Sequence, residues 1–319
     1  MTSGPDGAGI AAAARLLRRC DGWNMTLDEP FGALVVLAEL VAALDRLSRD
    51  RGPAAWAAVR AGLAGHPLAM RLRQDPLIAR AWRREPGRWS GDPVLGDLLL
   101  RHPGAARLVA EASPLGRDLN VASSGLPWPE GARERQRLIA RIADSVAERR
   151  HGAEILAVTP GLAREIPLSL AGPDGAIARW VALEDDPVLL ASIHRAMPVP
   201  WVEPLRGDPR RALGPRSGLG RFDLIYQKIL DLWDDAAAET LVRGALAMLR
   251  PGGRLVLCNR APGTADEAFW SLGTGWRRVT RDEAALEALI RAAGPTHITA
   301  HRAVRTMNGA FVVAMVEVA

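Results

Sequence analysis

Residues 222–259 read FDLIYQKILDLWDDAAAETLVRGALAMLRPGGRLVLCN, the most informative stretch of the chain. The apolar run at residues 222–226 predicts a buried strand, and the spacing after it predicts a turn followed by an amphipathic helix. Arg250-Pro251-Gly252-Gly253 is expected to stop that helix, and residues 254–258 predict the next strand. The stretch therefore predicts a strand, a helix and a second strand in succession.

The same alternation runs through the second half of the chain. Short apolar runs, each followed by a turn and then helical spacing, occur at residues 155–158, 180–183, 201–204, 222–226 and 254–258. Strands that alternate with helices form a parallel sheet covered on both faces. The last two apolar runs, residues 298–304 and 310–318, are separated by only five residues, too few for a helix. They predict a terminal hairpin whose last strand enters the sheet antiparallel.

The first half of the chain has helical spacing instead. Apolar residues recur at three- and four-residue intervals in residues 11–17, 33–47 and 56–63, and a long charged helix is expected at residues 130–149. The stretch from Thr26 to Pro30 and the pair Asp75-Pro76 have the composition of helix starts.

Two stretches of the first half are rich in Gly, Pro and Ser. Residues 85–93 and 113–129 are therefore expected to be loops. Together these patterns predict a helical N-terminal domain at residues 1–150 and an α/β domain at residues 151–319.

Composition limits the class of protein. The chain has 319 residues, 48% of them hydrophobic and 24% charged, with a net charge of +5, as expected of a globular protein. Lys228 is the only lysine, so 40 of the 41 Lys and Arg residues are arginine. They are dispersed among acidic residues rather than clustered on one stripe, so we do not expect a nucleic-acid partner.

The cellular context is also predicted from composition. Two cysteines, Cys20 and Cys258, are too few for a disulfide framework or a thiolate zinc site, so we expect no metal and a reducing, cytoplasmic compartment. Residues 31–44 form an apolar run that Glu39 interrupts, and the run is shorter than the ~20 residues that span a bilayer. We expect no secretion signal and no membrane segment.

Candidate binding residues lie in the turns after the first three strands of the α/β half. Doubly wound sheets bind ligands at the carboxyl ends of their strands, near the point where the strand order reverses. Gly161 follows the first strand and allows the backbone to approach a nucleoside closely. Glu184 ends the second strand and offers two carboxylate oxygens to a ribose. Asp208 follows the third strand and offers an acceptor to an adenine amino group.

Each candidate also has an ordinary structural explanation. Gly161 fits a plain turn, the acids from Glu184 to Asp186 fit a solvated helix start with Asp186 as its cap, and Asp208 before Pro209 fits a second helix start. Arg164 is expected near a helix N-terminus, where it could pair with a cofactor carboxylate or form a surface ion pair with Glu165 or another acid.

Three features together resemble a class I S-adenosylmethionine (SAM)-dependent methyltransferase. They are the segment at residues 222–259, the acidic turn from Glu184 to Asp186 and the terminal hairpin. The resemblance implies a Rossmann-like doubly wound sheet with an antiparallel terminal strand, and SAM as the cofactor.

A narrower resemblance covers roughly residues 66–318. Gln74-Asp75-Pro76, the stretch from Glu85 to Asp92, the turn with Gly161, Arg164 and Glu165, and residues 276–289 are similar to bacterial methyltransferases of extracellular-factor 3-hydroxypalmitic acid methyl ester biosynthesis. That family has a Pro-Arg-Gly-Tyr-x-Gly-Asp loop, a Gly-His-x-Arg-Glu turn and a Gly-Leu-Phe-Asp-Tyr segment. This chain has Pro86-Gly87-Arg88-Trp89-Ser90-Gly91-Asp92 for the first and Lys228-Ile229-Leu230-Asp231-Leu232 for the third, and keeps only Gly161, Arg164 and Glu165 of the second.

These matches suggest residues near the substrate. The loop with Arg88, Trp89 and Asp92 is expected to close over the sulfonium and the substrate, because an indole face attracts a cation and keeps the cavity dry. Lys228 is expected beside the substrate.

A catalytic base is needed only for some acceptors. Methyl transfer to a carboxylate needs none, whereas a hydroxyl or amine acceptor gains from one. Tyr226, which ends the fourth strand, is the predicted catalytic and cofactor-contacting residue, and His66, His151 and His194 are alternatives.

Four functions remain open from the sequence. The first is methylation of a small-molecule carboxylate or hydroxyl, with the helical half as a lid. The second is attack on the aminocarboxypropyl carbon of SAM, which releases methylthioadenosine. The third is binding of SAM or a partner without catalysis. The fourth is RNA methylation, for which the turn after the fourth strand lacks an Asn-Pro-Pro-Tyr motif. The oligomeric state is not predicted.

Overall fold

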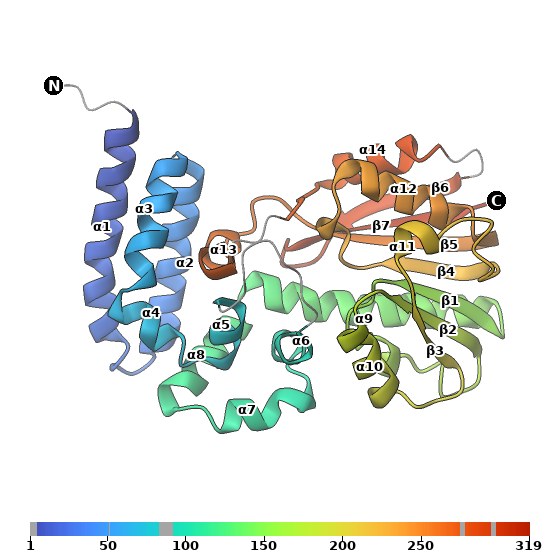
Figure 1. Cartoon of the computed structure of the whole chain (residues 1–319), viewed down its shortest axis with the longest axis horizontal. Coiled ribbons are helices and arrows are strands. Elements are labelled where there is room, and N and C mark those ends of the chain that lie inside the picture. Colours follow the sequence, from blue (N-terminus) through green and yellow to red (C-terminus); the bar gives the residue numbers. More distant parts are fainter. Residues whose placement is uncertain (1–4, 51, 83–91, 275–277, 295–297) are drawn as a thin grey trace. The chain divides into compact units, whose positions relative to one another are not determined.

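The computed structural model describes residues 5–50, 52–82, 92–274, 278–294 and 298–319 (Figure 1). The chain forms two compact units. In the described part of the chain, the helical unit comprises residues 5–50, 52–82, 97–130 and 263–274, and the sheet unit comprises residues 92–96, 131–262, 278–294 and 298–319. Both units are discontinuous in sequence, so they do not coincide with the expected division at residue 150, which stays a prediction.

A seven-stranded sheet is the centre of the sheet unit (Figure 1). Its strands are β1 (Ala153–Val158), β2 (Ile177–Glu184), β3 (Val202–Arg206), β4 (Phe222–Gln227), β5 (Leu249–Arg260), β6 (Ile298–Arg305) and β7 (Phe311–Val318). They are arranged in the order β3-β2-β1-β4-β5-β7-β6. Strands β1 to β5 pair in parallel, and β7 runs antiparallel to both β5 and β6. The predicted doubly wound sheet with an antiparallel terminal strand is confirmed.

Alternate residues of the central strands face opposite layers of helices. Ala157 and Trp180 lie in one core cluster with α9 (Pro127–Arg149) and α10 (Pro187–Ala196). Leu156 and Val181 lie in the other cluster, with α12 (Asp235–Leu246) and α14 (Glu283–Ala292). This period of two is the geometry of a sheet buried on both faces.

The connection between β1 and β2 departs from the expected alternation of strand and helix. It holds no α-helix, only the single 3-10 turn Ile166–Leu168, so the prediction of a helix beginning near Arg164 was wrong. Thr159, Gly161 and Ala163 all have left-handed backbone, with φ of 47°, 63° and 51°. An α-helix requires consecutive right-handed residues, and these three positions interrupt it.

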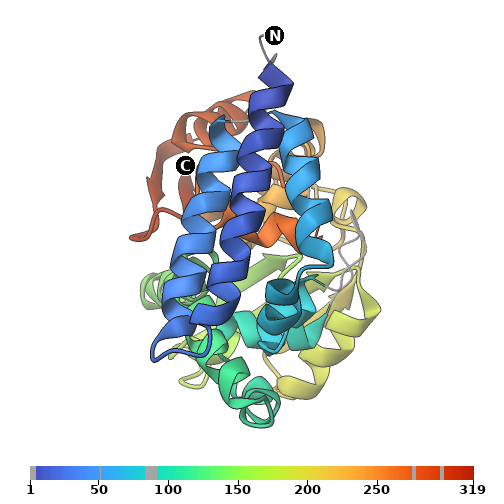
Figure 2. The ribbon, with the colours of Figure 1, turned by 90° about the vertical axis from the view of Figure 1, so that its left-hand side faces the viewer.

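The helical unit is built around three long helices. Helices α1 (Pro5–Thr26), α2 (Gly32–Asp50) and α3 (Pro53–Ala64) lie side by side (Figure 2). The shorter elements are α4 (Pro67–Leu72), α5 (Pro76–Trp82), a 3-10 turn (Pro103–Ala105), α7 (Ala106–Ala110), α8 (Pro114–Ser124) and α13 (Glu267–Thr274). Helix α13 follows β5 in sequence but packs against α2 and α5. Helix α6 (Pro93–Leu100) and the first turn of α9 cross the boundary between the two units.

The loop predicted at residues 113–129 is instead helix α8 followed by the start of α9. Ser113 is the N-cap of α8, where its hydroxyl accepts a hydrogen bond from the N–H of Gly116, and Pro114 occupies the first helical position. Ser and Pro therefore mark a helix start here rather than a loop.

Asp75 connects α5 to α8 inside the helical unit. The residue is fully buried, and its carboxylate accepts hydrogen bonds from the N–H of Leu77 (2.8 Å), from Asn120 Nδ2 (2.8 Å) and from the Ser123 hydroxyl. Burial raises the pKa of Asp75, while its hydrogen bonds lower it. The expected helix start at Asp75-Pro76 is confirmed.

Asp75→Ala is expected to lower the free energy of unfolding by about 2–4 kcal/mol, because it removes a helix cap and leaves buried donors on α8 without an acceptor. Chemical denaturation checks this, with the exposed Asp118→Ala on α8 as the matched control. A loss no larger than that of the control would contradict the role of Asp75.

Among the residues that the structure describes, there is no helix with the length and apolar character needed to cross a bilayer.

Candidate functional site

The strand order of the sheet reverses between β1 and β4, which are hydrogen-bonded neighbours (Figure 1). On the β1 side of this pair the sheet continues with β2 and β3, and on the β4 side it continues with β5, β7 and β6. In such sheets the turns at the carboxyl ends of the strands beside this point form the ligand crevice. The site is therefore built from the turns after β1, β2 and β4.

Glu184 ties the turn after β1 to the end of β2. It is the last residue of β2, as predicted, and is only 1% exposed. Its Oε2 accepts a hydrogen bond from the N–H of Gly161 (3.0 Å). Its Oε1 accepts from the N–H groups of Asp185 (3.1 Å) and Asp186 (3.2 Å). Two turns from different strands are thus fixed around one carboxylate.

Burial raises the pKa of the Glu184 carboxyl to about 7, although the N–H groups of Asp186 and Gly161 favour the charged form. A carboxyl in this state changes charge near neutral pH. Further hydrogen-bond donors from a ligand would stabilise the charged carboxylate and lower its pKa. Strongly perturbed acids in a ligand crevice are typical of functional sites.

The turn after β1 has room for a ligand. A Cβ placed on Gly161 would meet no atom within 4 Å, and the left-handed φ of this residue favours glycine. Thr159 also has left-handed backbone, and its buried hydroxyl oxygen has no hydrogen-bond partner among the described residues. Strained backbone and an unsatisfied polar atom side by side are features of binding sites.

The residues at the end of β4 belong to a buried polar cluster, here called the Glu165 network and defined by Glu165, Tyr226, Lys228, Gln136 and Trp180. Glu165 forms a buried ion pair with Lys228. The Tyr226 hydroxyl donates to Glu165 Oε1 (2.6 Å) and accepts from Trp180 Nε1 (3.2 Å). Lys228 also donates to Gln136 Oε1 (3.3 Å).

Burial sets the protonation tendencies in the Glu165 network. It raises the pKa of Tyr226 well above its usual value, and the neighbouring Glu165 raises it further. Burial lowers the pKa of Lys228, while Glu165 opposes that change. The structure brings the predicted residues Tyr226 and Lys228 together, because both contact Glu165. The sequence indicated Glu165 only as part of a motif.

Arg135 is a buried residue of this region that the sequence analysis did not identify. It lies on α9, and its Nη1 donates to the carbonyl oxygen of Lys228 (2.6 Å). Its guanidinium carbon lies 4.3 Å from the centre of the Phe311 ring. Burial lowers the pKa of Arg135, and its Nε has no partner among the described residues. Nothing in the sequence distinguishes it from the other arginines of α9.

The remaining predicted site residues lie apart from this cluster. Asp208 caps the short helix α11 (Pro209–Ala212) through the N–H of Arg210 (3.0 Å) and forms an ion pair with the Arg210 side chain (2.9 Å). Asp186 caps α10, as predicted. Asp92 caps α6 through the N–H of Val94 (3.0 Å). Arg164 is half-buried in the connection between β1 and β2. Arg88 and Trp89 lie outside the described residues.

The three histidines considered as bases are not at the ends of β1 or β4. His66 belongs to the helical unit, where its Nδ1 accepts from the N–H of Leu68 (3.1 Å) and caps α4. His151 and His194 are exposed. Tyr226 is therefore the one candidate base among these four that belongs to the Glu165 network.

Comparison with known proteins identifies the fold. No protein-family model and no curated protein sequence matches the chain. A structure from Bordetella parapertussis, described as a possible exported protein, is 17% identical, with 99% of each chain covered and a TM-score of 0.58.

Two methyltransferase structures are more distant. The N-methyltransferase NodS from Bradyrhizobium japonicum WM9, in complex with S-adenosyl-L-homocysteine, is 16% identical over 71% of this chain and 99% of its own, with a TM-score of 0.44. Magnesium protoporphyrin IX methyltransferase from Synechocystis PCC 6803 is 15% identical over 60% and 86%, with a TM-score of 0.44. The likeness to the Bordetella structure over the whole chain shows the fold alone, and the strand order is that of the Rossmann-like sheet expected from the resemblance to class I methyltransferases, with an added helical region.

Proposed function

We propose that the protein is a SAM-dependent methyltransferase that acts on a carboxylate or hydroxyl of a small molecule, in specialised metabolism. The observation that carries the proposal is the buried Glu184 at the end of β2, bonded to the Gly161 turn at the point where the strand order reverses. An acid in this place suits a ribose, and a glycine turn beside it suits a nucleoside.

The residues present fit SAM. Three backbone N–H groups occupy three of the roughly four acceptor positions of the Glu184 carboxylate, so Oε2 has one position left for a ribose hydroxyl. The open space at Gly161 admits the nucleoside, and the Thr159 hydroxyl supplies a polar group. Contacts of Asp208 with the adenine and of Arg164 with the cofactor carboxylate stay predictions.

Bound SAM supplies an electrophilic methyl group on a sulfonium. The chain itself has to hold the acceptor in line with that methyl group and keep water out. Tyr226 is the predicted base for a hydroxyl acceptor. Burial raises its pKa and its hydroxyl already donates to Glu165, which makes proton removal by Tyr226 unfavourable near neutral pH. These properties favour a carboxylate acceptor, which needs no base.

The roles of residues 1–150, of the loop with Arg88, Trp89 and Asp92, and of Lys228 in covering or contacting the substrate are part of the same proposal. So are a cytoplasmic location and the absence of a nucleic-acid partner.

Titration of the full chain with SAM and with S-adenosylhomocysteine in a calorimeter tests the proposal. We expect saturable binding of both, in the range of about 1 μM to 1 mM that enzymes show for their substrates. Absence of heat with both ligands on folded protein would overturn the proposal.

Mass spectrometry of the products then separates two reactions. Incubation with SAM and a panel of carboxylic acids and alcohols is expected to yield S-adenosylhomocysteine. Methylthioadenosine as the product would instead establish attack on the aminocarboxypropyl carbon.

A further inference from the structure

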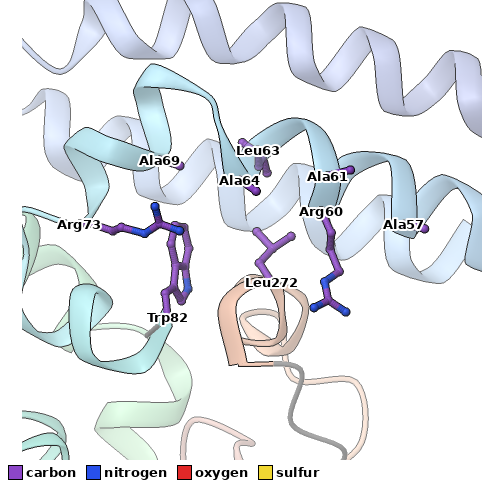
Figure 3. A pocket seen from close by; sticks show the side chains of 9 residues that line it. All are labelled: Ala57, Arg60, Ala61, Leu63, Ala64, Ala69, Arg73, Trp82 and Leu272. Atoms are coloured by element: carbon purple, nitrogen blue, oxygen red, sulfur yellow. The ribbon is translucent and has the colours of Figure 1, made fainter. Parts of the chain in front are cut away.

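The helical unit contains a pocket of about 460 Å³ between α3, α4, α5 and α13 (Figure 3). Every residue that lines it belongs to this unit. The volume lies in the range of about 300–1,000 Å³ that small-molecule sites occupy. The proposed methyl transfer gives residues 1–150 a general role in covering the substrate, but it assigns no step to the residues of this pocket.

Seven of the nine described residues that line the pocket are apolar, and two are arginines. Leu63 of α3, Ala69 of α4 and Leu272 of α13 contribute aliphatic surface, and Trp82 at the end of α5 contributes its ring (Figure 3). The Trp82 ring packs against the Phe269 ring, with a distance of 5.4 Å between the two ring centres. The pocket therefore offers a preformed surface to an apolar ligand.

Two arginines supply all of the charge that the described residues place on this wall. Arg60 and Arg73 line the pocket, and no Asp or Glu of the described part of the chain does. Within the described ranges, neither guanidinium has a carboxylate partner. Arg73 instead lies over the Trp82 ring, 5.8 Å from its centre, and donates to the sulfur of Met70 (3.8 Å). In Figure 3, Leu272 lies between the Trp82 ring and the Arg60 side chain. Two cations facing one pocket attract an anion.

Trp82 adds an independent indication of a ligand. Its side chain is only 8% exposed, and its Nε1–H has no acceptor among the described residues. A buried donor without an acceptor costs about 1–3 kcal/mol. An oxygen atom of a ligand in the pocket would satisfy this donor.

We propose that this pocket binds an organic oxyanion with an apolar body. Its charged head group is attracted by the positive charges of Arg60 and Arg73 and accepts a hydrogen bond from Trp82 Nε1. Its apolar body lies against Leu63 and Leu272. Two arginines beside an apolar surface exclude two other classes of ligand. Small inorganic anions would leave the apolar surface uncovered, and neutral lipids would leave both arginine charges uncompensated.

Matched small ligands test the proposal by calorimetry on the full chain without SAM. Octanoate has both the charge and the apolar body, 1-octanol lacks the charge, and acetate lacks the body. We expect octanoate to bind saturably and 1-octanol to bind at least about tenfold more weakly, because a charge-assisted hydrogen bond is worth about 1.5–3 kcal/mol. Acetate is expected to give no detectable binding.

Variants assign the binding to this pocket. Arg60→Gln and Arg73→Gln are each expected to weaken octanoate binding about tenfold, whereas Arg46→Gln, an exposed arginine of α2, is expected to leave it unchanged. Trp82→Phe keeps the ring, removes the donor and is expected to weaken binding about threefold to tenfold. Near-ultraviolet circular dichroism verifies that each variant is folded.

Three results would overturn the proposal. They are no binding of octanoate at millimolar concentration, equal affinity for octanoate and 1-octanol, and an effect of Arg46→Gln as large as those of Arg60→Gln and Arg73→Gln. Because these measurements contain no SAM, their failure leaves the methyltransferase proposal untouched, and failure of SAM binding leaves this one untouched.

Discussion

Glu184→Gln is expected to weaken SAM binding by about 100-fold. A ribose hydroxyl that donates to the carboxylate forms a charge-assisted hydrogen bond worth about 1.5–3 kcal/mol, and an amide at this position offers only a neutral acceptor. Calorimetry at pH 8, where Glu184 is ionised, measures the effect. Glu148→Gln, an exposed residue of α9, is the matched control. A Glu184→Gln protein that binds SAM as tightly as this control would remove the basis of the proposed site.

The same residue predicts how binding depends on pH. Because burial raises the pKa of Glu184 to about 7, part of the protein carries a neutral carboxyl at neutral pH. Ribose hydroxyls favour the carboxylate, so SAM binding releases a proton below that pH. The affinity is expected to fall by about tenfold per pH unit below 7, and Glu184→Gln is expected to lose this dependence.

The pKa of Glu184 also has a consequence for stability. Its value of about 7 in the folded protein exceeds the ordinary 4.5, so the folded protein holds a proton that the unfolded chain has already lost between these pH values. The contribution of this proton is complete below about pH 4.5 and is lost as the pH rises through 7, with a magnitude of about 3 kcal/mol. Glu184→Gln is expected to flatten this part of the stability profile.

The position of Glu184 was predictable because strand ends are local features. An apolar run followed by acids and a proline defines where β2 stops, and the alternation of strands and helices defines a parallel sheet. The short connection before β7 likewise left only an antiparallel hairpin. These features need no knowledge of distant residues.

Features that depend on local backbone or on distant contacts were not predictable. The left-handed residues between β1 and β2 replace a helix, although only Gly161 of the three is a residue that favours that conformation. Ser113 and Pro114 begin a helix in a stretch whose composition indicates a loop. Arg135 and the pocket beside Trp82 are produced by packing of segments far apart in sequence, and composition carries no signal for either.

The largest expected loss of stability comes from the buried ion pair of the Glu165 network. Glu165→Leu leaves the Lys228 ammonium buried without an anion and removes the acceptor of the Tyr226 hydroxyl. The free energy of unfolding is expected to fall by about 3–5 kcal/mol, the usual result of removing one partner of a buried pair. Lys228→Met leaves Glu165 as the unpaired charge and is expected to cost a similar amount.

The double variant distinguishes a balanced pair from two independent contributions. Glu165→Leu with Lys228→Met removes both charges, so most of the stability lost in each single variant is expected to return. Urea denaturation of the four proteins measures the coupling. Glu239→Leu on α12, which breaks an exposed ion pair with Arg243, is the control and is expected to cost less than about 1 kcal/mol. Losses that simply add in the double variant would contradict the pairing.

The pH dependence of Glu165→Leu identifies the unpaired group. Burial lowers the pKa of Lys228, and in this variant the opposing charge of Glu165 is gone. The folded protein then prefers the neutral amine, while the unfolded chain stays protonated up to a pH of about 10.4. Stability of Glu165→Leu is therefore expected to increase as the pH rises toward that value, and Glu165→Leu with Lys228→Met is expected to lack the increase. If the two variants had parallel pH profiles, the loss in Glu165→Leu would come from packing rather than from the buried charge.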